Sequence, residues 1–562
     1  MLTILINSIL SSFILISSGF FLKKKKKLEI VDICEIAFFG AIFLSFISIA
    51  LNFILPINRL LSNIVFISLI ILFILSYKNF YNLKNICVTI LCTGCITSLI
   101  LTLDNIYRPD AGLYHLPYTN IINENNIIIG LANIHFRFGH ISVIQYLNAI
   151  FNNEILGTHG ILLPAATIFS FFLVYLIQEI KNSFDKKIYC TFIFFIFTYT
   201  LYGFNRYGEF GNDATAHIYL FLVFIFFLKE FDKENIKINL INKLLLLSIF
   251  SFLQKTTMLI GIFIPLYCYF FLKDKIKVIN FTNFFSFIFI LIWLIKNTLI
   301  SGCLIYPISV TCFDKLNWYS NEKNYQISAT YQSLENESWS KGWPDKKDDK
   351  LNFDEYNKNF NWIETWILNH GFQILKKLSL FIIFIFIFLY LIKKNTQNLI
   401  EKNKKKESED GILILLCTGI IGTALWFFRF PTYRYGSSYI ILTIILISIY
   451  YFKKKNEFID SIKFKKKILF FMILFLTLFT LKHGVRIIKN YSLKYYDYPW
   501  PRIYGDNFEN YKEKSRPVLD GEKIIYYKSN TICMYSDSPC THFDISNIKY
   551  NEKFIFKIFN IK

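Results

Sequence analysis

Apolar segments long enough to cross a lipid bilayer recur along this 562-residue chain, from residue 2 to residue 481. A helix needs about 20 apolar residues to span the hydrocarbon core. Within a bilayer the backbone polar groups must be paired inside the protein, and a helix pairs them within one segment. The composition, 54% hydrophobic and 18% charged, also excludes an ordinary soluble protein. The sequence therefore predicts an all-α polytopic membrane protein.

The apolar segments predict about 12–14 transmembrane helices, with large external loops and a small mixed external C-terminal region. They cover residues 2–22, 34–55, 60–77, 86–103, 161–180, 188–204, 214–228, 244–254, 257–272, 278–300, 378–392, 411–428, 437–452 and 468–481. We interpret residues 244–272 as a tight hairpin of two short helices that meet at Lys255. A single crossing there would move the later Lys-rich loops to the opposite side of the membrane.

The basic residues predict the orientation of the chain. The net charge is +21, but Lys and Arg lie in short clusters between apolar segments, so we expect no nucleic-acid partner. We place these clusters in the cytoplasm, at residues 23–27, 181–187, 229–243, 273–277, 393–406 and 453–467. Both termini then lie outside the cytoplasmic (inner) membrane, on the periplasmic side.

This topology divides the chain into six parts. They are a four-helix N-terminal segment (1–103), a first large external loop (104–160), membrane helices (161–300), a second large external loop (301–377), further membrane helices (378–481) and an external C-terminal region (482–562). Two short cysteine pairs lie in the external parts, which predicts disulfides between Cys303 and Cys312 and between Cys533 and Cys540. We predict no metal site from these pairs, because each supplies only half of a tetrahedral zinc set.

The first large external loop carries the strongest candidates for chemistry. It opens with Asp104 and Asp110, followed by Tyr114 and His115. Acids at this depth are costly unless they are paired or functional. Asp110 and Tyr114 would share a helix face, whereas His115 would point elsewhere unless the helix breaks near Pro117. Alternatively, Asp110 caps a short interfacial helix.

A second acidic loop lies between residues 205 and 213. It holds Arg206, Glu209 and Asp213, with His217 in the helix that follows. Asp213 alternatively caps that helix. Two acidic loops at one membrane face are nevertheless what an acid–base or metal-dependent site requires.

Several cations near the external face are suited to binding a phosphate group. Arg429 and Arg434 lie at an external membrane edge, Lys255 lies at the proposed hairpin tip, and Lys296 precedes a polar turn. The alternative for the arginines is that they anchor a helix at the interface.

Four segments carry a family resemblance: RPDAGLYHLPYTNII, GLANIHFRFG, KNTLISGCLIYP and FRFPTYRYG, in that order. They resemble a bacterial family of multi-pass membrane proteins with glycosyltransferase-C-like architecture, over roughly residues 80–450. More distantly, the chain is similar to lipid-phosphate-sugar-dependent mannosyl and aminoarabinose transferases. The resemblance implies an essential acid at Asp110 and a second acid at Asp213. The chain departs from the pattern of these transferases in two respects. Four apolar segments precede the acidic loop, and Lys296 stands where an arginine is expected.

The leading hypothesis is an inverting glycosyltransferase that uses a polyprenyl-phosphate sugar and a glycan, lipid or protein acceptor. Asp110, or else Asp104, would be the general base. Arg434, Arg429 and Lys255 would stabilise the departing phosphate. We assign no certain cofactor and leave open a divalent cation. The alternatives are a transporter or flippase of lipid-linked or polar solutes, an O-antigen ligase or polymerase, and a noncatalytic assembly protein.

Tryptophans are concentrated in the second large external loop. Five of them, Trp318, Trp339, Trp343, Trp362 and Trp366, fall within residues 301–377. They would bind sugars by stacking or cover the site. Alternatively, they only lie on the membrane surface.

Overall fold

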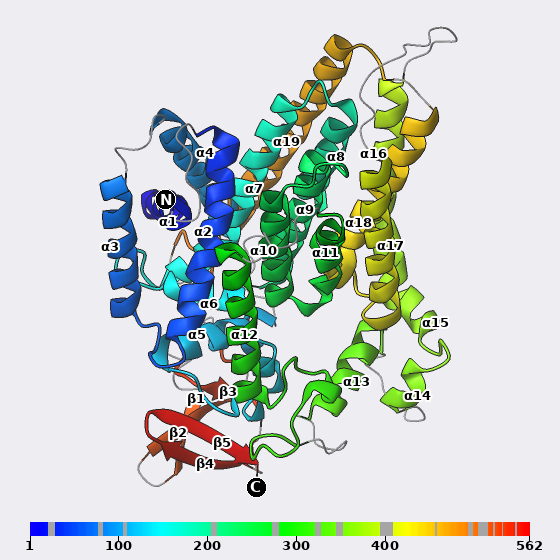
Figure 1. Cartoon of the computed structure of the whole chain (residues 1–562). Helices are drawn as coiled ribbons and strands as arrows, with labels where there is room; N and C mark the ends of the chain where they lie inside the picture. The colour runs from blue at the N-terminus through cyan, green and yellow to red at the C-terminus, as the bar shows by residue number, and fades with distance from the viewer. Residues whose placement is uncertain are drawn as a thin grey trace.

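The computed structural model describes residues 1–20, 28–76, 83–104, 110–203, 211–272, 280–320, 328–343, 352–393, 409–455, 458–492, 498–503, 515–520, 523–530, 532–543, 545 and 548–561. Within these ranges the chain is mostly helical, and the long helices form an elongated bundle (Figure 1). Arg206, Glu209 and the Lys clusters at 23–27 and 273–277 lie outside the described residues.

Four helices open the chain: α1 (Leu2–Gly19), α2 (Ile30–Leu51), α3 (Arg59–Ser76) and α4 (Leu83–Leu101). Glycine allows α1 and α2 to approach closely, because a Cβ atom at Gly40 would lie 1.9 Å from the carbonyl oxygen of Leu15. Hydroxyl pairs join other helices, as where Thr97 Oγ1 donates to Ser170 Oγ over 2.8 Å. Close small-residue contacts and polar pairs hold helices together in lipid, where burying apolar surface gains little.

The centre of the bundle contains α7 (Leu163–Asn182), α8 (Lys187–Gly203), α9 (Asp213–Glu230), α10 (Ile238–Gln254), α11 (Phe263–Phe270) and α12 (Phe281–Ser301). The predicted hairpin is present. α10 ends at Gln254, Lys255 has an extended backbone, and a 3-10 turn (Thr256–Ile262) leads into α11. Ser248 Oγ donates to the carbonyl oxygen of Gly261 over 3.1 Å, so the two arms lie antiparallel. Lys255 is therefore at the tip of the hairpin.

The last membrane helices are α16 (Phe372–Ile392), α17 (Glu409–Arg429), α18 (Tyr433–Lys455) and α19 (Ser461–Tyr491). Within the described residues, each of the fourteen predicted apolar segments lies mostly on a helix. The last helix is longer than the predicted 468–481, because its Lys-rich first turns and the turns around Arg486 are also helical.

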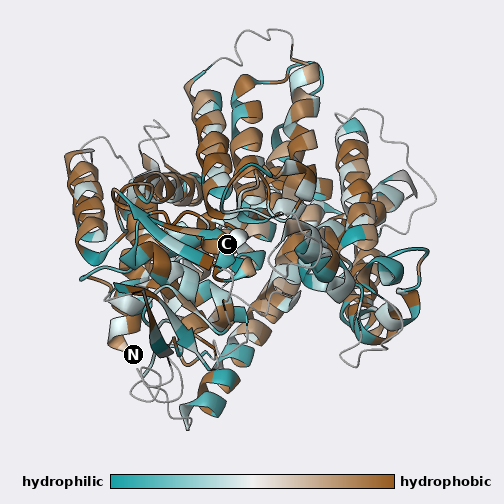
Figure 2. Cartoon of the chain, turned by 90° about the horizontal axis from the view of Figure 1, so that it is seen from below, coloured by the Kyte–Doolittle hydropathy of each residue, from teal (hydrophilic) through white to brown (hydrophobic). Residues whose placement is uncertain are grey.

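Nine of the described helices are long and apolar enough to cross a membrane. Many of their outward side chains are apolar: Phe284, Phe386 and Phe470 are 64%, 64% and 63% exposed. Such extensive exposed apolar surface is typical of a membrane interface. Figure 2 shows peripheral helices that are hydrophobic along much of their length, whereas the strands carry hydrophilic residues. The chain is a multi-pass helical membrane protein, as predicted.

Short elements gather at one end of the bundle (Figure 1). They are α5 (Leu116–Glu124), α6 (Val143–Ile150), α13 (Ala329–Ser340), α14 (Phe353–Asn357), α15 (Ile363–Trp366) and five strands. β1 (Ser515–Asp520), β2 (Lys523–Ser529) and β3 (Cys540–Thr541) form one sheet in that order, with β1–β2 antiparallel and β2–β3 parallel. β4 (Ile548–Lys553) and β5 (Phe556–Ile561) form an antiparallel pair. The small mixed C-terminal region is therefore present, and both predicted disulfides, Cys303–Cys312 and Cys533–Cys540, are formed.

The C-terminal region packs directly on the first large loop. The N–H group of Phe559 donates to the carbonyl oxygen of Ile129 over 2.9 Å, and that of Met534 donates to Gly112 over 2.8 Å. Tyr535 also bonds through its hydroxyl, which donates to Asn123 and accepts from Asn152. The C-terminal region thus packs against the loop segment that begins at Asp110 and stabilises it.

Replacing Tyr535 with Phe should loosen this contact. The change removes the hydroxyl that bridges Asn123 and Asn152 and leaves these side chains with their mutual hydrogen bond of 3.4 Å, at a cost of about 0.5–1.5 kcal/mol for each hydrogen bond lost. We expect a lower melting temperature in detergent and faster proteolysis of the tail. Tyr498→Phe is the matched control, since Tyr498 is 53% exposed. Equal melting and cleavage in the two variants would show that the tail does not depend on this contact.

Candidate functional site

Asp110 begins an unusual helical turn. It precedes a π-helical segment, Ala111–His115, that continues into α5. A π-helix has i to i+5 hydrogen bonds and wider turns than an α-helix, so the regular α-helix in which His115 would point away from Asp110 is interrupted just before Pro117. His115 lies close enough to Asp110 for the carboxylate to act on its pKa. Tyr114 and His115 both line one cavity, and their rings lie 4.3 Å apart.

Arg434, in the first turn of α18, holds the Asp110 carboxylate. Its Nη1 lies 2.5 Å from Asp110 Oδ2, and its Nη2 donates to the Tyr435 hydroxyl over 3.1 Å. The guanidinium also lies 5.2 Å from the centre of the Trp339 ring. Asp110 and Arg434 are 324 positions apart in the sequence, so the bundle itself creates this pair.

A second ion pair lies beside the first. Lys255 at the hairpin tip pairs with Asp213, the first residue of α9. The Lys255 ammonium lies 4.0 Å from the centre of the Tyr435 ring, and Arg434 bonds to the hydroxyl of that ring. Asp110, Arg434, Tyr435, Lys255 and Asp213 thus form a continuous row of contacts.

His217 fixes the start of α18. Its Nε2 lies 2.9 Å from the carbonyl oxygen of Arg434, and its Nδ1 lies 2.7 Å from Ser438 Oγ. A carbonyl only accepts, so Nε2 carries the proton and Ser438 donates to Nδ1. His217 is one turn beyond Asp213 on α9, so it ties the backbone of Arg434 to the helix that carries Asp213.

The surroundings of Asp110 and His115, both in the first large external loop, determine their ionisation states. Burial acts to raise the pKa of Asp110, but the charge and hydrogen bond of Arg434 hold that pKa below its ordinary value. Burial lowers the pKa of His115 from 6.5 to about 4, although Asp110 and Asp213 oppose the shift. At neutral pH, Asp110 is therefore a carboxylate and His115 is neutral.

The burial of His115 should make stability depend on pH. Its pKa is lower in the folded protein, so as the pH falls the unfolded chain takes up this proton first. The stabilisation present above pH 6.5 is then lost towards about pH 4. We expect the melting temperature of the wild type to fall more steeply over this range than that of His115→Gln. Parallel curves would contradict the low pKa of His115.

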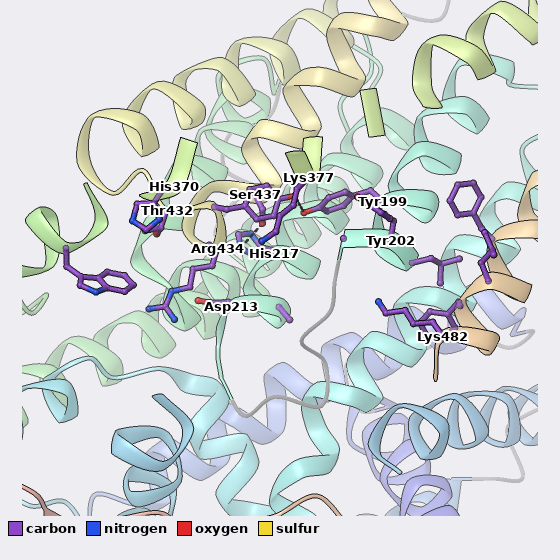
Figure 3. Close-up of a pocket in the computed structure, with 18 residues that line it drawn as sticks. Tyr199, Tyr202, Asp213, His217, His370, Lys377, Thr432, Arg434, Ser437 and Lys482 are labelled. Carbon is purple, nitrogen blue, oxygen red and sulfur yellow. Dashed lines mark hydrogen bonds between the residues drawn. The ribbon is translucent and has the colours of Figure 1, made fainter. Parts of the chain in front are cut away.

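Two cavities meet at Asp213 and Arg434, which line both of them. The larger cavity, of about 720 Å³, lies among α8, α9, α16, α18 and α19. Figure 3 shows Arg434 and Asp213 towards one side of it and Lys482 at the other, with Lys377 and Tyr199 between them. Its apolar lining includes Leu201, Phe475, Leu478 and Phe479.

Most of the residues that line the smaller cavity, of about 170 Å³, are polar or charged. This cavity lies between the first large loop, the hairpin tip at Lys255 and α12. Asp213 and Arg434 thus lie between the larger cavity, whose lining is partly apolar, and the smaller cavity, whose lining residues are mostly polar.

Two of the predicted site residues lie elsewhere. Asp104 is paired with Arg486 of α19 over 3.0 Å, and Arg486 also donates to carbonyl groups at the end of α4. Arg429 is the last residue of α17, is 69% exposed, and contacts Glu337 over 3.3 Å. Neither residue lines either of the two cavities. Asp110 does not line the cavities either, but its partner Arg434 lines both, whereas the partners of Asp104 and Arg429 line neither.

Lys296 also points away from both cavities. Its ammonium donates to Asn52 Oδ1 over 2.9 Å and lies 4.6 Å from the ring centres of Phe53 and Tyr146. It therefore joins α12 to the end of α2.

Sequence reasoning missed several residues at this site. Tyr435 contacts Arg434, Lys377 and Lys482 line the larger cavity, and Arg137 lines the smaller one. Of the five tryptophans expected to stack on sugars or cover the site, Trp339 contacts Arg434 and lines the larger cavity. Arg137 and Tyr435 stand inside the segments HFRFG and TYRYG, and the available signal was that these segments belong to those that carry the family resemblance.

Comparison with known proteins gives one family. The family model described as "Domain of unknown function (DUF8201)" matches residues 1–441. The chain belongs to this family. The matched part contains Asp110, Asp213, Lys255 and Arg434, whereas α19 and the strands follow it. No curated protein and no solved structure matches the chain.

Proposed function

We propose that this DUF8201 protein is an integral-membrane glycosyltransferase with glycosyltransferase-C-like architecture. It transfers a sugar from a polyprenyl-phosphate donor to an envelope glycan, lipid or protein at the external membrane face. One observation carries the proposal: Arg434, which lines both the partly apolar cavity and the smaller cavity, holds the carboxylate of Asp110. A base paired with a phosphate-binding cation that lines two such cavities suits sugar transfer from a lipid.

The larger cavity suits the lipid-phosphate part of the donor. Its cations include Arg434, Lys377 and Lys482, and its apolar wall is formed partly by Phe475 and Phe479 of α19. A polyprenyl chain would leave the cavity along this wall, while its phosphate stays near the guanidinium. The sugar would then face Asp110 and the smaller cavity.

The transfer would proceed by in-line displacement with inversion. An acceptor hydroxyl oxygen forms a bond to the anomeric carbon, and the bond from that carbon to the phosphate oxygen breaks. The electron pair leaves with the lipid phosphate, and the acceptor proton passes to Asp110. Arg434 stabilises the departing phosphate. Since a phosphate bound to Arg434 draws it away from Asp110, donor binding would make the carboxylate more basic.

This proposal includes the finer topology predicted from the sequence. About 12–14 helices cross the inner membrane, and both termini and the strand-bearing end face the periplasm. A divalent cation would add further charge stabilisation. However, no group of three metal-ligating side chains is found among the residues that the structure describes, and the proposed steps need none.

The proposal is tested in a strain that lacks the protein. Mass spectrometry should show the loss of one sugar from an envelope product and accumulation of that sugar on a lipid phosphate. Restoring the wild-type chain should reverse both changes. Unchanged glycans and lipid-linked sugars in the deletion strain would contradict sugar transfer.

A further inference from the structure

The smaller cavity concentrates buried polar atoms that lack hydrogen-bond partners. Six of its lining residues have such an atom within the described part of the chain: His115, His140, Gln254, Thr257, Asn336 and Arg434. They include hydrogen-bond donors, acceptors and atoms that can act as either. Each buried polar group without a partner costs roughly 1–3 kcal/mol. Their convergence on one cavity therefore indicates a hydroxyl-rich ligand that pairs with them.

The size and walls of the cavity limit this ligand. Its volume of about 170 Å³ is below the roughly 300–1,000 Å³ of pockets that hold drug-sized molecules. Four aromatic side chains also line the cavity: Tyr114, Trp293, Tyr306 and Tyr435. A lining with both polar and aromatic groups suits a single sugar ring, which has hydroxyl groups at its rim and C–H groups on its faces.

Arg137 gives the cavity an excess of positive charge. Lys255 and Arg434 are each paired with a carboxylate, but Arg137 forms no ion pair with any described residue. Its guanidinium lies over the rings of Tyr114 and Phe136, 5.4 and 5.0 Å from their centres. The carboxylates of Glu335 and Asp110 lie within electrostatic reach of Arg137, but Glu335 accepts a hydrogen bond from Gln332 over 2.9 Å and Asp110 is paired with Arg434. A partly buried cation of this kind calls for an anionic group on the ligand.

We propose that the smaller cavity binds an acidic monosaccharide and that Arg137 recognises its negative charge. The anionic group is a carboxylate, as in a uronic acid, or a phosphate ester on the ring. The inference rests on the proposed function only for the role of the sugar, as the group transferred or the group that accepts it. The binding itself follows from the unpaired polar atoms and the unpaired cation.

Binding to the purified full-length protein in detergent tests this inference. Galacturonate, galactose 6-phosphate, galactose and inorganic phosphate are titrated at pH 7, with saturation-transfer NMR or calorimetry as the readout. At least one anionic sugar should bind about tenfold or more tightly than galactose and inorganic phosphate. Which of the two sugars binds more tightly identifies the anionic group.

Two variants assign the preference to Arg137. Arg137→Gln should reduce the binding of the anionic sugar to within about twofold of galactose and leave galactose binding unchanged. Arg516→Gln, on the exposed face of β1, should retain the preference. Equal binding of galactose and both anionic sugars, full competition by inorganic phosphate, or an unchanged preference in Arg137→Gln would each overturn the inference.

The outcome is separable from that of the proposed function. An Arg137-dependent charge preference, together with an unchanged glycan profile in the deletion strain, would support the sugar site and contradict the transferase. Loss of an envelope sugar in the deletion strain, without any charge preference in binding, would support the transferase and contradict the acidic-sugar site.

Discussion

Cells in which Asp110→Asn replaces the wild-type chain should lose the envelope sugar and accumulate its lipid-phosphate donor. Asparagine is similar in size and still accepts a hydrogen bond from Arg434, but it does not take up the acceptor proton. Removing a positioned general base slows a reaction by about 10²–10⁴-fold. The measurement is mass spectrometry of envelope glycans and lipid-linked sugars at matched membrane abundance of the two proteins.

The matched control for this substitution is Asp410→Asn. Asp410 also forms an ion pair, with Lys233 over 3.0 Å, but its side chain is 51% exposed and Lys233, unlike Arg434, lines neither cavity. We expect this variant to restore the wild-type profile. If Asp110→Asn restores it as well, Asp110 is not the base.

Arg434→Gln should have the next largest effect. The substitution removes the charge that would stabilise the departing phosphate, and loss of one such group typically costs about 10²–10³-fold in rate. Arg434→Lys should retain part of the activity, because a lysine keeps the charge but not the planar, bidentate geometry. Donor consumption by purified variants in detergent gives these rates, with Arg516→Gln as the control.

Combining the two substitutions tests whether Asp110 and Arg434 act together. Residues that act in one step are not additive, so the double variant should be little slower than the slower single variant. Multiplied losses would mean that the two residues act independently, and the ion pair would then be incidental to the reaction.

The sequence was sufficient to predict the membrane class, the positions of the apolar helices and the hairpin at Lys255. These follow from the lengths of the apolar segments and from the spacing of Lys clusters, which are local properties. Both disulfides were also predictable, because each pair lies within ten residues in a part of the chain expected to be external.

The arrangement of the site was only partly predictable. Asp110, Asp213, Lys255 and Arg434 were singled out by residue type, but their pairing depends on how α9, α18 and the hairpin meet. Asp104 and Arg429 had the same local features and were separated from the site by tertiary packing against Arg486 and Glu337. The orientation of His115 stayed open in the sequence, because the π-helical turn before Pro117 has no clear sequence pattern.

The second cavity and Arg137 were not predictable from the pattern of residues. Such a cavity can be recognised only in the folded structure, where buried polar atoms without hydrogen-bond partners lie close together. The contact between the C-terminal strands and the first loop likewise joins positions more than 400 residues apart, such as Asn123 and Tyr535.

Reconstitution with the natural donor tests the central claim most directly. Lipids extracted from the deletion strain, which should hold the accumulated donor, are incorporated into vesicles with purified wild-type protein or Asp110→Asn and an envelope acceptor fraction. The account predicts that the wild type converts the lipid-phosphate sugar to free lipid phosphate and glycosylated acceptor, while Asp110→Asn leaves it intact. Equal consumption by both proteins, or none by the wild type, would contradict sugar transfer at Asp110.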